Sequence, residues 1–172
     1  MKLMADAAYP TTTVPPGSKA IAGYLGGDAA HIWTADEWAL FSPFGRLPIW
    51  VASTGSGGRG DIQAEAAITT LHKLGVPQGK TIALDLEMRV APGFVYLFTN
   101  VIRKAGWRTV TYGSESTIFQ NPTDLGVWVA HYDGIPNVEP DRPGHPVVGT
   151  QYAEGTDWDL SMIRWTLRRN LW

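Results

Sequence analysis

The sequence predicts an α/β fold, a small TIM-like barrel of roughly (β/α)5(β)3 architecture in which the last strands lack helices. Eight segments have the pattern of β-strands, and the first five alternate with segments of helical periodicity. The last three are joined by loops that leave no room for complete helices. A complete barrel of this kind usually needs about 250 residues, so the loss of helices allows eight strands to fit into 172 residues. We expect a single domain, 1–172.

The strands are predicted from short apolar runs that are bounded by glycine, proline or polar turn residues. A glycine pair, Gly26-Gly27, closes the second run, and several prolines mark the long loop before the seventh. Because helical crossovers connect the first five strands, these are expected to be parallel. The predicted strands are 3–8, 20–25, 47–53, 81–88, 108–113, 126–132, 146–152 and 158–163.

The helices are predicted from capping residues and from apolar side chains that recur at helical spacing. Thr34 and Glu37 form a capping-box pattern at the start of the first helix. The second helix is expected over 61–74 and the third over 92–105, each followed by a glycine that ends it. A short helical turn is expected over 114–119.

Two carboxylates lie two positions apart in the apolar run 81–88, at Asp85 and Glu87. Because side chains alternate along a strand, both would share a face with Ala83, while Leu84 would point into a packed layer. Two neighbouring carboxylates cannot both ionise freely, and a fold keeps such a pair mostly where its perturbed acidity is used. The alternative is a strand that ends at the surface and leaves both acids in water.

Composition and charge exclude several other classes of protein. Hydrophobic residues make up 44% of the chain and charged residues 17%, which is typical of a packed globule. The formal net charge of -2 gives no general attraction to nucleic acid. The chain has no cysteine, and its histidines lack the spacing of metal ligands, so we predict neither a metal nor a cofactor. We also expect no membrane span and no signal peptide.

Four acidic residues lie near predicted strand ends, where barrel enzymes carry their catalytic groups. In a closed barrel the first and last strands are neighbours, so one acid from each would lie across the mouth from the central pair. Glycoside hydrolysis needs one acid that protonates the leaving oxygen and a carboxylate that supports the oxocarbenium-like transition state. The four candidates are Asp6, Asp85, Glu87 and Asp159. Candidate groove residues, for each of which core packing is the alternative, are Tyr24, Trp50, Tyr112, Trp128, Tyr132 and Gln151.

Five short motifs follow one another along the chain. They are Leu84-Asp-Leu-Glu87, Thr111-Tyr-Gly-Ser114, Val127-Trp-Val-Ala-His-Tyr132, Gln151-Tyr152 and Trp158-Asp-Leu160. This ordered set resembles the family-25 glycoside hydrolases, which are lysozymes (N-acetylmuramidases) of bacteria and phages. Two further segments, 21–27 and 47–50, are similar to a sister group, the glycoside-hydrolase-like domains of actinobacteria and their phages. The resemblance covers nearly the whole chain.

The resemblance implies hydrolysis of a β-1,4 bond in bacterial peptidoglycan. Glu87 matches the family's proton-donating glutamate, and Asp85 matches the aspartate two positions before it. Asp6 and Asp159 match the acids of the first and last strands, which would position water or substrate and stabilise positive charge. Peptidoglycan or a related wall polysaccharide would be the partner. The protein would act outside the cytoplasm at the cell wall, as a phage lysin or within a virion or larger assembly.

Two alternatives remain open. The first and third strands, Met4-Ala-Asp-Ala-Ala8 and Ile49-Trp-Val-Ala52, differ from the family pattern. These differences are compatible with an inactive barrel that binds wall sugars or serves as a structural module of a virion. The other alternative is dinucleotide binding, because Gly55-Ser-Gly-Gly-Arg-Gly60 satisfies a glycine fingerprint between a strand and a helix, with Asp85 about 25 residues later.

Overall fold

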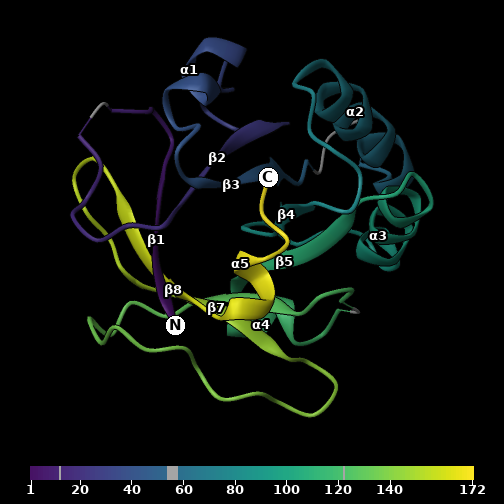
Figure 1. The fold of residues 1–172 in the computed structure, drawn as a ribbon. Coiled ribbons are helices and arrows are strands. Elements are labelled where there is room, and N and C mark those ends of the chain that lie inside the picture. Colours follow the sequence, from purple (N-terminus) through teal and green to yellow (C-terminus); the bar gives the residue numbers. More distant parts are fainter. Residues whose placement is uncertain (12, 54–57, 122) are drawn as a thin grey trace.

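The eight predicted strands form one closed barrel in the computed structural model, which describes residues 1–11, 13–53, 58–121 and 123–172. The strands are β1 (Lys2–Ala7), β2 (Ala20–Gly27), β3 (Gly45–Val51), β4 (Thr81–Asp85), β5 (Arg108–Ser114), β6 (Val127–Ala130), β7 (Val147–Ala153) and β8 (Asp159–Ile163). Their order around the barrel follows the chain, and β1 to β7 are parallel. Strand β8 is antiparallel to both of its neighbours, β7 and β1. The predicted barrel is therefore confirmed (Figure 1).

The helices lie outside the barrel or at one end of it (Figure 1). They are α1 (Ala35–Leu40), α2 (Gly60–Lys73), α3 (Phe94–Lys104), α4 (Glu115–Ile118) and α5 (Trp165–Arg168). The capping box expected for the first helix is confirmed, since the Thr34 side chain accepts from the Glu37 backbone and Glu37 reaches back to the Thr34 backbone. In the part of the chain that the structure describes, no helix has both the length and the apolar character needed to cross a membrane.

The side chains of β4 alternate between two packed layers, as the sequence of the run 81–88 predicted. Ala83 and Asp85 point into the barrel, where Ala83 packs with residues of the other strands. Ile82 and Leu84 point outward into a second layer, which α2 and α3 cover. This second layer explains why β4 is buried on both faces, as expected for a parallel strand covered by helices.

Strand β4 ends earlier than the sequence predicted. Its last residue is Asp85, although the Leu86 backbone N–H still donates to the carbonyl of Tyr112 on β5, at 2.9 Å. The chain then leaves the sheet, so Glu87 lies in the following loop and is exposed. Strand β6 likewise ends at Ala130, two residues before the expected limit.

The C-terminal segment closes the end of the barrel where the parallel strands begin. Trp172 and Arg46 exchange two backbone hydrogen bonds, of 2.8 and 2.9 Å, and the Thr81 N–H donates to the carbonyl of Asn170. The Leu171 side chain enters the interior cluster below the strands. The guanidinium of Arg46 stacks on the Trp172 ring, 3.5 Å from its centroid. We call this closed end the base and the opposite end, where β1 to β7 finish, the mouth.

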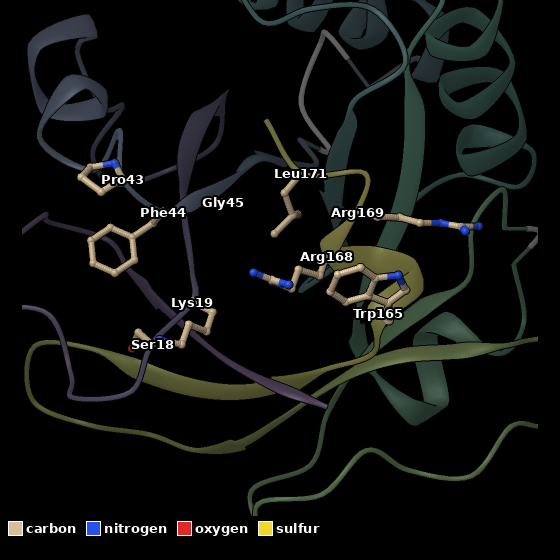
Figure 2. A pocket seen from close by; sticks show the side chains of 9 residues that line it. All are labelled: Ser18, Lys19, Pro43, Phe44, Gly45, Trp165, Arg168, Arg169 and Leu171. Atoms are coloured by element: carbon tan, nitrogen blue, oxygen red, sulfur yellow. The ribbon is translucent and has the colours of Figure 1, made fainter.

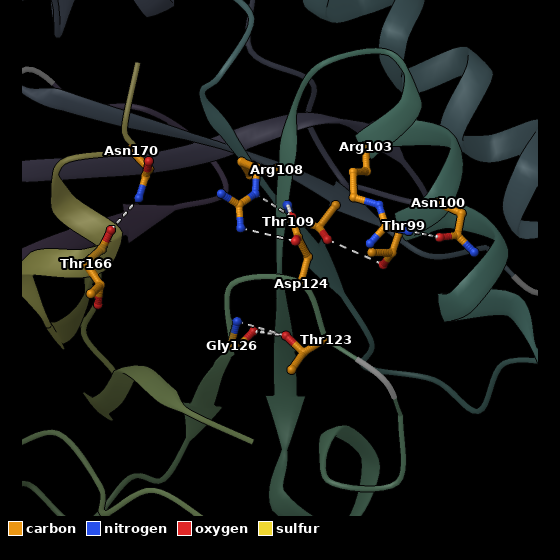
Figure 3. A network of polar contacts seen from close by, with 10 residues as sticks. All are labelled: Thr99, Asn100, Arg103, Arg108, Thr109, Thr123, Asp124, Gly126, Thr166 and Asn170. Carbon is orange, nitrogen blue, oxygen red and sulfur yellow. Dashed lines mark hydrogen bonds and ion pairs between the residues drawn. The ribbon is translucent and has the colours of Figure 1, made fainter. Parts of the chain in front are cut away.

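A polar network at the base fixes the start of β5 (Figure 3). The Asp124 carboxylate accepts two hydrogen bonds from the Arg108 guanidinium, at 2.8 and 3.2 Å, and one from the Thr109 backbone N–H, at 3.2 Å. Next to it, the Thr123 hydroxyl bonds both backbone groups of Gly126, just before β6. These contacts hold the loop between α4 and β6 against the barrel.

Candidate functional site

Two carboxyl groups from the ends of the chain meet at the mouth. Asp6 on β1 and Asp159 on β8 are direct partners in the antiparallel register. Gln151 on β7 joins them, because its amide Nε2 donates to Asp159 Oδ2 at 3.0 Å and approaches Asp6 Oδ1 at 3.4 Å. The sequence-based expectation that Asp6 and Asp159 lie close together is therefore confirmed.

Two tyrosines fix the orientation of the Gln151 amide. The hydroxyls of Tyr112 and Tyr132 both donate to its Oε1, the latter at 3.1 Å, and the two hydroxyl oxygens are 3.2 Å apart. Since Oε1 is committed to the tyrosines, the NH2 group of Gln151 must face the two carboxyl groups. Gln151 is only 2% exposed, so this network is held inside the mouth.

Asp85 is the carboxyl group at the end of β4, and it is 1% exposed. Burial raises the pKa of Asp85 to about 8, with further contributions from the charges of Glu87 and Asp6 and a small opposing effect of the Glu87 backbone N–H. Its Oδ1 is buried without a hydrogen-bond partner among the described residues. Asp85 is therefore protonated at neutral pH in the folded protein.

Burial also raises the pKa values of the two acids on the opposite side of the mouth. The pKa of Asp6 lies well above its usual value, mainly because the group is buried and secondly because Asp159 is close. Burial also raises the pKa of Asp159. Hydrogen bonds from the Gly155 backbone N–H, which donates to Oδ1 at 3.1 Å, and from Gln151 oppose this rise. Asp157, an acidic residue two positions before Asp159, is exposed outside the strand.

Tyr24 lies on β2 and is partly buried. Burial and then the charges of all four carboxyl groups, Asp85, Asp6, Glu87 and Asp159, raise its pKa. Its side chain packs partly against the interior cluster of the barrel.

Two aromatic residues that were expected in the groove lie elsewhere. Trp50 is on the outer face of β3, packs in the layer below α2, and donates its Nε1 to Gln63 Oε1 at 3.1 Å. The prediction that Trp50 lines the groove is wrong, because Leu47 and Ile49 occupy the inward face of that strand. Trp128 does point inward but is 1% exposed, and it lies below Tyr112 with its ring centroid 4.5 Å away. Trp128 is therefore a core residue that packs against Tyr112 rather than a residue that lines the groove.

Sequence reasoning missed Ser161, which is fully buried on the inward face of β8. Its hydroxyl accepts the Nε1–H of Trp128 at 3.0 Å and so fixes the ring that packs below Tyr112. The signal was present in the sequence, because Ser161 is two positions after Asp159 and must share its face.

One group of side chains in the described ranges has the composition of a cation site. Ligand atoms of Glu115, His131 and Glu139 lie within 4.8 Å of one another. They already have partners, since His131 Nδ1 lies 3.0 Å from Glu139 Oε1 and Arg142 Nη2 lies 2.5 Å from Glu115 Oε2. The predicted absence of a metal rested on the lack of cysteine and on the histidine spacing, and it stays a prediction.

The dinucleotide alternative loses its structural context. That fingerprint serves an open, doubly wound sheet with a switch point between strands, whereas this sheet is a closed barrel. Of its glycines, Gly55 and Gly57 lie outside the described residues. Gly60 begins α2, and a Cβ there would come within 2.1 Å of the Phe94 carbonyl oxygen, so close packing with α3 explains this glycine.

Comparison with known proteins finds similar solved structures. No family model matches the chain, and no curated protein matches it. An uncharacterized protein of B. stearothermophilus superposes over 100% of both chains, with a TM-score of 0.82 and 17% identity. The Tat-secreted protein Rv2525c of Mycobacterium tuberculosis, in complex with HEPES, superposes over 95% of both chains, with a TM-score of 0.65 and 16% identity.

A third similar structure is the modular autolysin LytC of Streptococcus pneumoniae in complex with a synthetic peptidoglycan ligand. The match covers 93% of this chain and 46% of LytC, with a TM-score of 0.62 and 16% identity. At this level of identity the likeness concerns the fold alone. The chain therefore has a barrel fold similar to that of the autolysin LytC and of the Tat-secreted protein Rv2525c.

Proposed function

We propose that the chain is a lysozyme-type glycoside hydrolase of family 25 that cleaves β-1,4 bonds in bacterial peptidoglycan. The observation that carries the proposal is the position of Asp6, Asp85 and Asp159 at strand ends around one mouth of the barrel, with Gln151 bonded to both Asp6 and Asp159. Two of them, Asp6 and Asp159, come from strands that meet only where the barrel closes. The likeness of the fold to an autolysin that binds a peptidoglycan ligand supports this choice of substrate.

Asp85 and Glu87 form the side of the reaction centre that would supply the general acid. The two groups interact, and burial keeps a proton on Asp85 at neutral pH, whereas Glu87 faces the solvent. The charge of Glu87 contributes to the raised pKa of Asp85, so removal of Glu87 should lower the pKa of Asp85. We assign proton donation to the leaving oxygen to Glu87, the more accessible group and the one that the family resemblance favours, with Asp85 as its neutral neighbour.

Asp6 and Asp159 form the other side of the reaction centre. Gln151 orients both carboxyl groups, and Asp6 Oδ2 has no hydrogen-bond partner among the described residues. This free oxygen would bind a water molecule or a sugar hydroxyl. Asp159, which is only half-buried, would stabilise the positive charge that develops on the sugar ring. Tyr132, which is 54% exposed, would contact the glycan at the rim.

Such an enzyme would act at the cell wall, outside the cytoplasm, as a phage lysin or as a component of a virion. The test is to incubate the protein with purified peptidoglycan, reduce the products with borohydride and analyse them by mass spectrometry. Reduced muramic acid at the new ends is the expected result. Reduced glucosamine ends would show cleavage of the other glycosidic bond, and an unchanged wall would contradict hydrolysis.

A second candidate is a barrel that binds wall sugars without cleaving them, as a binding or virion structural module. The exposure of Glu87 in a loop beyond β4 favours it, because a general acid usually needs burial that raises its pKa. Sedimentation of the protein with peptidoglycan, without release of new reducing ends, would favour this second candidate.

A further inference from the structure

Cationic side chains gather at the base, opposite the candidate active site. Each of the strands β1 to β5 begins beside one of them, either within its first two residues or just before it. Strand β8 runs the other way, so the residue after its end joins the same face, and α5 adds two more. These basal cations are Lys2, Lys19, Arg46, Lys80, Arg108, Arg164, Arg168 and Arg169.

Few carboxylates balance this charge. Asp124 pairs with Arg108 and Asp141 pairs with Arg164, each at 2.8 Å. Within the four described ranges, Lys19 makes no ion pair with a carboxylate, and neither do Arg168 and Arg169. The base therefore carries excess positive charge although the whole chain has a net charge of -2. Complementarity of this kind attracts and orients anionic partners.

Lys19, Arg168 and Arg169 contribute to the lining of a pocket of about 380 Å³ at the base (Figure 2). Lys19 and Phe44 form one side, and Trp165 and Arg168 form the other. The Arg168 side chain points across the pocket toward the side of Lys19, while Arg169 points away on the far side of α5 (Figure 2). A second hollow of about 540 Å³ shares Trp165 and Arg169 with the first.

The walls of this pocket are fixed by the barrel itself. The Lys19 backbone donates to the carbonyl of Leu3 on β1 and accepts from the N–H of Gly45 on β3. Gly45 has Leu171 packed directly on it, since a Cβ there would lie 2.9 Å from Leu171 Cδ1. Trp165 is 59% exposed between the two hollows, with the Arg168 guanidinium 4.9 Å from its ring centroid. The site is thus preformed and combines free cations with an exposed aromatic face.

We propose that the base of the barrel binds an anionic wall polymer of phosphodiester-linked units, with Lys19 and Arg168 contacting a phosphate and Trp165 packing against the neighbouring unit. Paired cations across a hollow suit a phosphate group, and an exposed tryptophan suits the apolar face of a sugar or polyol. Two hollows along one face suit a repeating chain better than a flat membrane surface. The choice of a wall polymer rests on the proposed function, which brings the protein to the cell wall.

The test measures binding of the full chain to fluorescently labelled poly(glycerol phosphate) by anisotropy, at 50 and 200 mM salt. The test variant is the double substitution Lys19→Gln with Arg168→Gln. The matched control is Lys73→Gln with Lys104→Gln, which removes the same charge from exposed residues in the last turns of α2 and α3. We expect the test variant to raise Kd roughly tenfold or more and to weaken the salt dependence, because fewer counterions are released. The control should change Kd less than about threefold.

Each of the following two binding results overturns the proposal. Equal losses in the two double variants would mean that only net charge matters. Binding to vesicles containing phosphatidylglycerol, with none to the polymer, would assign the face to a membrane. Neither readout involves hydrolysis, so a protein that binds the polymer and releases no reducing ends would refute the proposed enzyme and leave this inference intact. Glu87→Gln should bind the polymer as the native chain does.

Discussion

Asp6 and Asp159 are register partners across β1 and β8, and a single side chain, Gln151, bonds to both of their carboxyl groups. This contact exists only because β8 turns antiparallel and closes the barrel against β1. The candidate site therefore depends on the closure of the barrel, which brings β1 against the β7–β8 pair from the other end of the sequence.

Gln151 should be a centre of stability as well as of site geometry. Gln151→Met keeps the volume but removes the acceptor of two tyrosine hydroxyls and the donor to two carboxyl groups. We expect a loss of about 2–4 kcal/mol in the free energy of unfolding, because buried polar groups lose their partners. Urea denaturation measures it, and Gln120→Met, at an exposed position of the same residue type, should cost less than about 0.5 kcal/mol. Equal effects of the two substitutions would contradict the role of the network.

Asp85 should make the protein less stable as pH rises. Its folded pKa of about 8 lies above the unfolded value near 3.8, so between these values the folded state holds a proton that the unfolded state has lost. Its contribution is complete below about pH 4 and is lost as pH rises toward 8, with a limiting slope of about 1.4 kcal/mol per pH unit. Asp6 acts in the same direction.

Urea denaturation at pH 5 and pH 8 checks this prediction. Asp85→Asn should flatten the decline of the unfolding free energy between the two pH values, because the amide does not titrate. Asp157→Asn, at an exposed acid near the same mouth, should leave the decline unchanged. A native protein that is more stable at pH 8 than at pH 5 would show that Asp85 is not a buried neutral acid.

The sequence was sufficient for the barrel and for the inward direction of Asp85, because alternation along a buried strand leaves no other arrangement for an acid among aliphatic neighbours. It was insufficient for Trp50. Strand β3 is apolar on both faces, since the interior and the helix layer both bury it, so apolar character alone gives no direction. The direction of Trp50 depends on its hydrogen bond with Gln63 on α2, a tertiary contact that the sequence pattern does not show.

The loop position of Glu87 also lay beyond sequence reasoning. The apolar run continues through Met88, yet the pairing of β4 with β5 ends at Asp85 and Tyr112. Strand ends depend on where the neighbouring strand diverges, which no local pattern records. The antiparallel direction of β8 was unpredictable for a similar reason, because a short loop from β7 permits either a hairpin or a return to the base.

Trp50 and Tyr132 should separate stability from function. Trp50→Phe removes the hydrogen bond to Gln63 in the outer layer and should lower the free energy of unfolding by about 1–3 kcal/mol, without changing kcat/KM on peptidoglycan by more than about twofold. Tyr132→Phe should lower kcat/KM on peptidoglycan and change the free energy of unfolding little, because the hydroxyl of this half-exposed residue bonds to Gln151 at the mouth. Denaturation and kinetics on both variants check this. A large loss of activity in Trp50→Phe with a stable fold would place Trp50 in the groove after all.

The Arg108–Asp124 contact should stabilise the base without influencing the mouth. Asp124 has a side chain only 9% exposed and accepts from both the Arg108 guanidinium and the Thr109 N–H. Asp124→Asn should cost about 1–2 kcal/mol, since the ion pair is partly open to solvent. Thermal unfolding measures it against Glu65→Gln, an exposed acid on α2. A loss of stability no larger than that of the control would show that this contact contributes no more than an exposed surface ion pair.

The most direct test of the account is the rate of reducing-end release from purified peptidoglycan by the native chain, Glu87→Gln and Asp157→Asn, each with its fold checked by circular dichroism. We predict that Glu87→Gln lowers the rate by about 100-fold or more, as loss of a general acid does, and that Asp157→Asn remains close to native. A Glu87→Gln variant that cleaves as fast as the native protein, or a native protein that releases no reducing ends, would contradict the assignment of this mouth as a glycosidase active site.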